Sequence, residues 1–173
     1  MDTYLAALIA HLDTLTMGAT PTDKLQYIDM DWGQLDYYNN APPVKFPCAL
    51  IDIRTMNYTG EGIGTQIGIV DIEVRIADIP LANSSAAAPA TQRHNAMRIH
   101  RLVNAVFAHL HGWQPANSPP SVGLGGFGPL TRISGTKTKR QDGIKEMRLV
   151  FRLQTDEQAA RRPYNTVSLQ ITP

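Results

Sequence analysis

Hydrophobic and polar residues alternate strictly through the middle of the chain. Within residues 65–77, apolar side chains fall on every second position from Val70 to Ile76, and charged residues occupy the positions between them: Val70, Ile72, Val74 and Ile76 against Asp71, Glu73 and Arg75. A β-strand points successive side chains to opposite faces, so this pattern predicts a strand with one covered and one polar face. Similar alternation predicts strands at 46–57, 129–139 and 143–154.

Turn residues separate these strands in pairs. Three glycines in residues 58–64 predict one hairpin connection, and Asp142-Gly143 carries the preferred chemistry of a tight turn for a second hairpin. Val167, Leu169 and Ile171 also alternate, which predicts a last edge strand at 165–172.

Apolar residues at helical spacing predict two helices. The first covers 3–16 and the second about 91–111, with Thr91 as its N-cap. Their buried stripes are Leu5, Leu8, Ile9, Leu12 and Leu15 in the first, and Ala96, Ile99, Val103, Val106 and Leu110 in the second. The expected fold class is therefore α+β, with a mainly antiparallel sheet of four to five strands and two helices packed on one face.

The 173 residues suit a single domain, 1–173. Residues 18–45 are expected to form a surface excursion with a short strand or turn, and the glycine- and proline-rich residues 112–128 a long loop. Residues 156–162 suggest a helical turn that Pro163 stops.

Composition excludes several classes of protein. The formal net charge is +1, so no overall field draws the chain to nucleic acid or to an anionic membrane. No segment is long and apolar enough to span a membrane, and the N-terminus lacks the features of a signal peptide, so we expect no membrane association. Charged residues make up 18% of the chain, a low share that is mildly suggestive of subunit contacts.

Candidate chemistry is sparse. Gly123–Gly128 matches G-x-G-x-x-G, but a strand rather than a helix should follow it, so dinucleotide binding is not expected. The helical histidines are not spaced three or four apart, so we expect no metal site and place them on helix surfaces. Cys48 lies in an apolar run typical of a buried residue. We expect no catalytic residues and no cofactor; a small enzyme or ligand-binding module using Asp71, Glu73 and the glycine-rich loop is the alternative.

The tip of the second hairpin is basic. It carries Lys137, Lys139, Arg140 and Lys145, with Arg132 and Arg148 on the adjoining strands. No aromatic residue is interleaved, which is unlike most single-strand nucleic-acid sites. The tip is either a solvated surface or a contact for passing DNA or an acidic partner.

One stretch resembles a known family. Phe46-Pro47-Cys48-Ala49-Leu50-Ile51, then Asn57-Tyr58-Thr59-Gly60-Glu61, then the strand to Ala77-Asp78-Ile79-Pro80, is similar to the tail terminator (tail completion) proteins of long-tailed bacteriophages. Detailed similarity covers about residues 46–80, although the order of elements agrees over most of the chain. The excursion at 18–45 and the loop at 112–128 are longer than in that family.

The resemblance implies a phage structural protein, not an enzyme. Family members form a hexameric ring that ends tail-tube polymerisation and faces the head connector; they assemble in the host bacterial cytoplasm and remain in the virion tail. The expected partners are copies of this chain, tail-tube protein and the head–tail connector, with passive contact to DNA in the lumen. Another neck or minor tail component is the alternative. Contacts to subunits or to the tube are expected at Tyr58, Glu61, Phe127, Arg132, Lys137, Lys139 and Arg140.

Overall fold

A computed structural model describes residues 1–17, 24–37, 42–62, 65–79, 82–115 and 126–157. Within these ranges a five-stranded mixed sheet is combined with three helices. The elements in chain order are α1 (Asp2–Asp13), β1 (Tyr27–Met30), β2 (Cys48–Gly62), β3 (Thr65–Asp78), α2 (Ala90–Ala96), α3 (Arg98–Leu110), β4 (Thr131–Thr138) and β5 (Lys145–Glu157). The predicted α+β class is confirmed.

The strand order across the sheet is β1-β2-β3-β5-β4. The β2–β3, β3–β5 and β5–β4 pairs are antiparallel, whereas β1 pairs with β2 in parallel. This parallel edge strand, β1, is the short strand expected in the excursion at 18–45. The two predicted hairpins are both present, and Gly143 at the second turn has a φ of 79°, which is the left-handed conformation that glycine tolerates.

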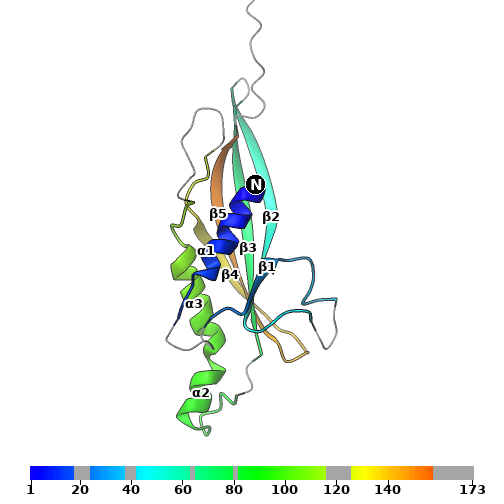
Figure 1. Cartoon of the computed structure of the whole chain (residues 1–173), viewed down its shortest axis with the longest axis vertical. Coiled ribbons are helices and arrows are strands. Elements are labelled where there is room, and N and C mark those ends of the chain that lie inside the picture. The colour runs from blue at the N-terminus through cyan, green and yellow to red at the C-terminus, as the bar shows by residue number, and fades with distance from the viewer. Residues whose placement is uncertain (18–23, 38–41, 63–64, 80–81, 116–125, 158–173) are drawn as a thin grey trace, which may run out of the picture.

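One face of the sheet packs against α1 and α3 (Figure 1). It carries the alternating apolar residues of the central strands, and the buried stripes of the two helices complete a continuous core. The fully buried members include Leu8, Leu12, Ile51, Ile72, Ile76, Leu102, Leu110 and Phe151. Burying this apolar surface supplies the main stabilisation of the fold.

The second predicted helix is two helices. The break falls at Met97, whose φ and ψ are −93° and 8°, and α2 begins after Pro89 rather than at Thr91. Ala96 is the single buried residue of α2, so packing does not hold α2 in line with α3. Arg98 fixes the start of α3, because its guanidinium donates to the buried carboxylate of Asp78 over 2.8 Å.

A smaller core lies on the opposite face of the sheet. Leu35 and Ile144 cover Cys48, Leu50 and Ala77 there. Leu35 therefore ties the excursion to the sheet, whereas Trp32 of the same loop is 50% exposed. Burial raises the pKa of the Cys48 thiol to about 12, so this group is an inert apolar side chain.

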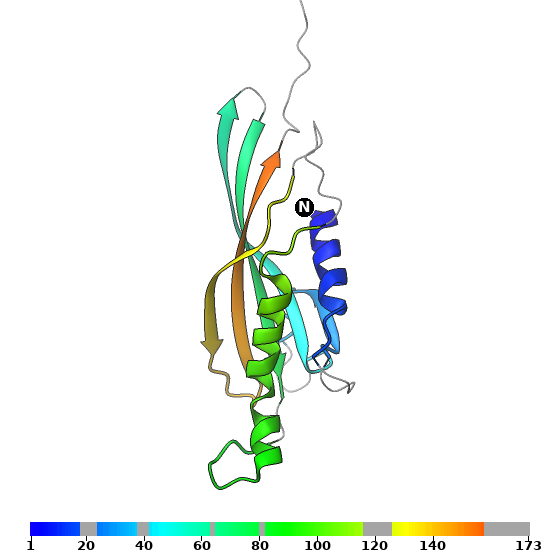
Figure 2. The same ribbon diagram turned by 90° about the vertical axis from the view of Figure 1, so that its left-hand side faces the viewer.

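The β2–β3 ribbon extends beyond the helices at one end of the molecule (Figure 2). Strand β2 continues five residues past its predicted end at 57, to Gly62, which is opposite Thr65, whereas β3 starts at Thr65 as predicted. Strand β5 also continues, to Glu157, so a helical turn starting at Asp156 is wrong at its first two residues. The rest of that turn, the predicted strand at 165–172 and most of the loop at 112–128 lie outside the described residues.

Candidate assembly surface

The residues predicted to make contacts lie at two ends of the sheet. Tyr58 is on the projecting ribbon, opposite Gly68 of β3, whereas Lys137 is level with Met147 and Ile76. Gly68 and Ile76 are eight residues apart on one strand, which is about 26 Å. The ribbon and the basic hairpin are therefore separate surfaces.

At the ribbon, Tyr58 lies on the same side of the sheet as the helices and is 42% exposed. Gly68 makes room for its ring, because a Cβ at that position would lie 2.8 Å from the tyrosine Cε1. Glu61 belongs to β2, but its side chain is outside the described part of the structure.

Phe127 belongs to the helical layer rather than to a free loop. Its ring packs on Tyr4 of α1 at a centroid distance of 4.7 Å, and its backbone forms a bridge to Thr155 of β5. The neighbouring Gly128 donates a backbone hydrogen bond to Gln154 over 2.7 Å. The end of the glycine-rich loop is thus attached to a sheet edge, an arrangement unlike the helix N-terminus that binds a dinucleotide.

Fewer cations of the basic hairpin can contact a partner than its sequence suggests. Arg132 lies 3.6 Å from the ring centroid of Phe107 in α3, a cation–π contact, and Lys145 donates to the carbonyl of Ala96 over 3.2 Å. Lys137 and Lys139 are exposed, and they are the residues of the predicted tip that can meet a partner.

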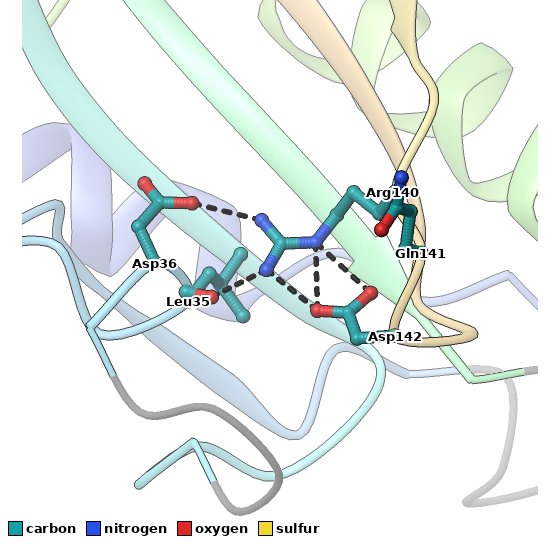
Figure 3. A pocket seen from close by; sticks show the side chains of 5 residues that line it. All are labelled: Leu35, Asp36, Arg140, Gln141 and Asp142. Carbon is teal, nitrogen blue, oxygen red and sulfur yellow. Dashed lines mark hydrogen bonds and ion pairs between the residues drawn. The ribbon is translucent and has the colours of Figure 1, made fainter.

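Arg140 is bound by carboxylates within its own chain (Figure 3). Its guanidinium donates to Asp142 over 2.7 Å, to Asp36 over 2.8 Å and to Glu146 over 3.1 Å. It also donates to the carbonyl of Leu35, so the second hairpin is tied to the excursion. The open depression beside it, lined by Leu35, Asp36, Arg140, Gln141 and Asp142, presents a cation already neutralised by these anions. This arrangement suits a structural clamp, not an anion-binding site.

Arg75 is the centre of this charged cluster. It is buried and donates two hydrogen bonds each to Asp36 and Glu146, plus one of 2.6 Å to Asp31. The Arg75 guanidinium holds the pKa of Asp36 down, to about 2, against the opposing effect of burial. Burial is the largest single effect on the pKa of Glu146 and would raise it, but the hydrogen bonds and positive charges of Arg75 and Arg148 together outweigh burial and lower this pKa.

The acidic residues Asp71 and Glu73, the candidates for acid–base chemistry, are also paired with arginines. Asp71 accepts from Arg152 over 2.7 and 2.9 Å, and these bonds lower its pKa. Glu73 accepts from Arg148 over 3.2 Å and lies 3.4 Å from Arg54. A carboxylate with a lowered pKa is a weak proton acceptor at neutral pH, so Asp71 is poorly suited to general base catalysis.

Two histidines do not lie on open helix surfaces as predicted. His11 of α1 and His109 of α3 stack with centroids 4.0 Å apart and planes at 7°, and Trp113 stacks on His11 at 4.6 Å. Each Nε2 is within hydrogen-bond distance of the other residue's carbonyl, at 3.0 and 2.9 Å. Burial lowers the pKa of His11, so the neutral ring is favoured. Helical spacing within each segment could not reveal a contact between positions 98 residues apart.

Within the described ranges, no group of three or more histidine, cysteine or acidic residues could hold a metal ion. None of the described helices is long and apolar enough to cross a membrane.

No protein-family model matches the chain, and no curated protein matches it. Among solved structures it is similar to a chain described as "Virion of native gene transfer agent (GTA) particle". The identity is 12% and the TM-score is 0.48, over 90% of this chain and 99% of that one. At this level the likeness supports no inference about function.

Proposed function

We propose that this chain is a structural protein of a phage-like particle, which caps the tail tube as an oligomeric ring and joins it to the head connector. The observation that supports this role best is the exposed outer edge of β4. Seven of its eight residues are exposed, and beyond Arg132 no described residue pairs with its outer side. Unpaired strand edges attract further strands, and natural monomers usually protect them.

The geometry also supports a ring rather than a symmetric dimer. The β4 edge and the projecting β2–β3 ribbon belong to different strands on either side of the sheet. When two different surfaces of the same chain meet, the contact is heterologous, and it generates a ring when the rotation between neighbouring copies closes.

The ribbon is also the part of the chain that resembles tail terminators. Residues 46–80 include β2 and β3, and the YTGE-like segment Tyr58–Glu61 is at its projecting end. A ribbon that reaches past the helical layer can contact a neighbouring subunit or the tube below it. Arg75, Arg140 and Asp71 are paired with partners within the chain, which favours an assembly role over chemistry.

The decisive experiment measures assembly and tube length together. Multi-angle light scattering should show concentration-dependent oligomers, and electron microscopy should show rings at tube ends. Tail-tube protein from the same genome, polymerised with the chain present, should give shorter tubes of defined end structure. A strict monomer that leaves tube length unchanged would exclude the proposal.

A charge-reversal pair sharpens this test. Lys137→Glu with Lys139→Glu alters the exposed part of the basic hairpin, while Lys45→Glu alters an exposed lysine elsewhere. We expect the double variant to weaken assembly or capping about tenfold and the control to behave as the natural chain does. If pull-downs instead recover connector protein and no tube protein, the chain is another neck component.

A further inference from the structure

The arginines of this chain fall into two groups according to their partners. Of the nine that the structure describes, six form ion pairs with carboxylates: Arg54, Arg75, Arg98, Arg140, Arg148 and Arg152. For the other three, no described carboxylate lies within ion-pair distance; these are Arg93, Arg101 and Arg132. Their positive charges are therefore not neutralised by any acidic group that the structure describes.

Neutral groups hold these guanidinium ions in place. Arg93 donates to the carbonyl of Ala86 over 2.6 Å, and Arg101 donates to the carbonyl of His94 over 2.7 Å. A hydrogen bond to a carbonyl orients the side chain but leaves its full charge in place. Because a guanidinium has five N–H donors, Arg93 and Arg101 keep donors for a further acceptor.

The fold brings these cations together where α2 and α3 run along the β4–β5 hairpin (Figure 2). Arg132 of β4 contacts Phe107 of α3, and Lys145 of β5 donates to the carbonyl of Ala96 at the end of α2. Lys137 is opposite Met147 on the same face of the sheet, which places it about 7–8 Å from Lys145. We call this set the basic strip: Arg93, Arg101, Arg132, Lys137 and Lys145.

The part of the chain that supplies most of the basic strip contains no acidic residue. Residues 79–141 include neither aspartate nor glutamate. The carboxylates that border this segment, Asp78 and Asp142, are paired with Arg98 and Arg140. The net charge of +1 therefore conceals a separation of charge, with the paired carboxylates over the opposite face and the unpaired arginines along the basic strip.

We propose that the basic strip binds the phosphate backbone of double-stranded DNA, with direct contacts from Arg93, Arg101 and Lys137. Phe107 and Ala96, which mark its two ends, are eleven residues apart, or about 16 Å along the helices. One DNA strand presents about five phosphates over that length. The charges of Arg132 and Lys145, held against the helices, add to the attraction without direct contact.

The surroundings of the basic strip favour duplex DNA over other polyanions. Between Ala90 and Leu110, which the structure describes throughout, Met97 is the one large apolar residue that is exposed. Stable protein–protein contacts have an apolar or aromatic centre, whereas protein–DNA contacts are polar and positively charged. Single strands are held by aromatic rings that stack on bases, but the ring of Phe107 already faces Arg132.

Fluorescence anisotropy of a labelled 20-base-pair duplex, titrated with the full-length chain, tests this proposal. Each phosphate contact contributes a slope of about −0.9 to log K against log salt, so three contacts predict a roughly fortyfold loss of affinity between 50 and 200 mM NaCl. Arg93→Gln with Arg101→Gln should weaken binding about tenfold at 50 mM NaCl. Its affinity should then fall only about threefold over the same salt range, because one contact remains. Circular dichroism verifies that the variant is folded.

The matched control is Arg54→Gln with Arg152→Gln, which makes the same change in net charge at two arginines of the opposite face, 53% and 50% exposed. This control should keep the affinity and the salt dependence of the natural chain. Absence of binding at 50 mM NaCl, or an equal loss in both double variants, would overturn the proposal. Displacement of the duplex by poly-glutamate at equal charge would also overturn it, since the partner would then be an acidic protein. The proposal does not rest on the tail-capping role; assembly and capping are measured without DNA, so either can fail alone.

Discussion

The two faces of the sheet are stabilised by different physical means. On the helical side, apolar residues from every second position of β2, β3 and β5 pack against α1 and α3. On the other side, alternate positions of the same strands carry charges, and Arg75 is buried there among three carboxylates. The apolar face follows from the period of each strand, whereas the charged face depends on which distant segments meet over it.

This difference decides how each face tolerates change. An apolar contact is non-directional, so a core can relax partly around a smaller side chain. Burying an ion pair has a large desolvation cost, so removal of one partner leaves the other charge buried and uncompensated. Both faces should therefore be sensitive, but they should respond differently to pH.

The largest effect is expected at the centre of the apolar face. Phe151 is fully buried, and Phe151→Ala should lower the free energy of unfolding by about 3–5 kcal/mol, because it removes apolar contact area and leaves a cavity. Urea unfolding followed by circular dichroism measures this loss. The exposed Gln154→Ala, on the same strand, should change it by less than about 0.5 kcal/mol. Equal losses in the two variants would contradict the assignment of this face to the core.

The next test removes the central cation of the charged face. Arg75→Met keeps much of the side-chain volume but leaves Glu146 and Asp31 without their main partner. Since an unpaired buried carboxylate is costly, we expect a loss of about 3 kcal/mol at neutral pH. The loss should shrink in acid, when Glu146 can take up a proton. A pH-independent loss would mean that Arg75 contributes through packing alone.

Local sequence patterns predict the strands but not the contacts between residues far apart in the chain. Period-two alternation located β3 and the second hairpin, because a strand that is half buried must alternate. It could not locate the partner of Arg75, since Asp31 and Glu146 are 44 and 71 positions away in sequence. Nor could it show that Arg140, assigned to an exposed basic tip, is neutralised by Asp36.

Two further features depend on tertiary structure in the same way. Nothing in Tyr27–Met30 itself indicates that it pairs in parallel with β2. No proline or glycine in the sequence around Met97 predicts the helix break there. The break follows instead from the packing of α3 and from the hydrogen bond between Arg98 and Asp78.

Acid titration of Asp36 tests the charged face, with a smaller expected change in stability. The pKa of Asp36 is lowered in the folded state to about 2, so its contribution to stability is present above the ordinary value near 4 and is lost as the pH falls toward 2. Because its side chain is 44% exposed, solvent screens the interaction and we expect only about 1 kcal/mol. Asp36→Asn should therefore be destabilised at pH 6 and should approach the natural chain near pH 2.

The control for this titration is another aspartate paired at the surface. Asp13 lies 3.2 Å from Lys24, and its side chain is 69% exposed. Asp13→Asn should change stability by less than about 0.5 kcal/mol across the same pH range, since exposed ion pairs contribute little. If both variants gave the same pH profile, the Arg75 cluster would have no special role in acid stability.

The smallest expected effect comes from the stacked histidines His11 and His109, which join α1 to α3. Burial lowers the pKa of His11 and outweighs the opposing hydrogen bond to the His109 carbonyl, so the folded state disfavours the protonated ring. Stability from this contact should therefore be full above the ordinary histidine value near 6.5 and should decline as the pH falls below it. His11→Gln should remove that slope between pH 7.5 and 5 at a cost below about 1 kcal/mol, measured by urea unfolding at each pH. His94→Gln, on α2 and outside the stack, should keep the slope, because the stacked pair is still present. A slope that survives in His11→Gln would place the titrating group elsewhere, and the helical side of the sheet would then be stabilised by apolar contacts without a contribution from this pair.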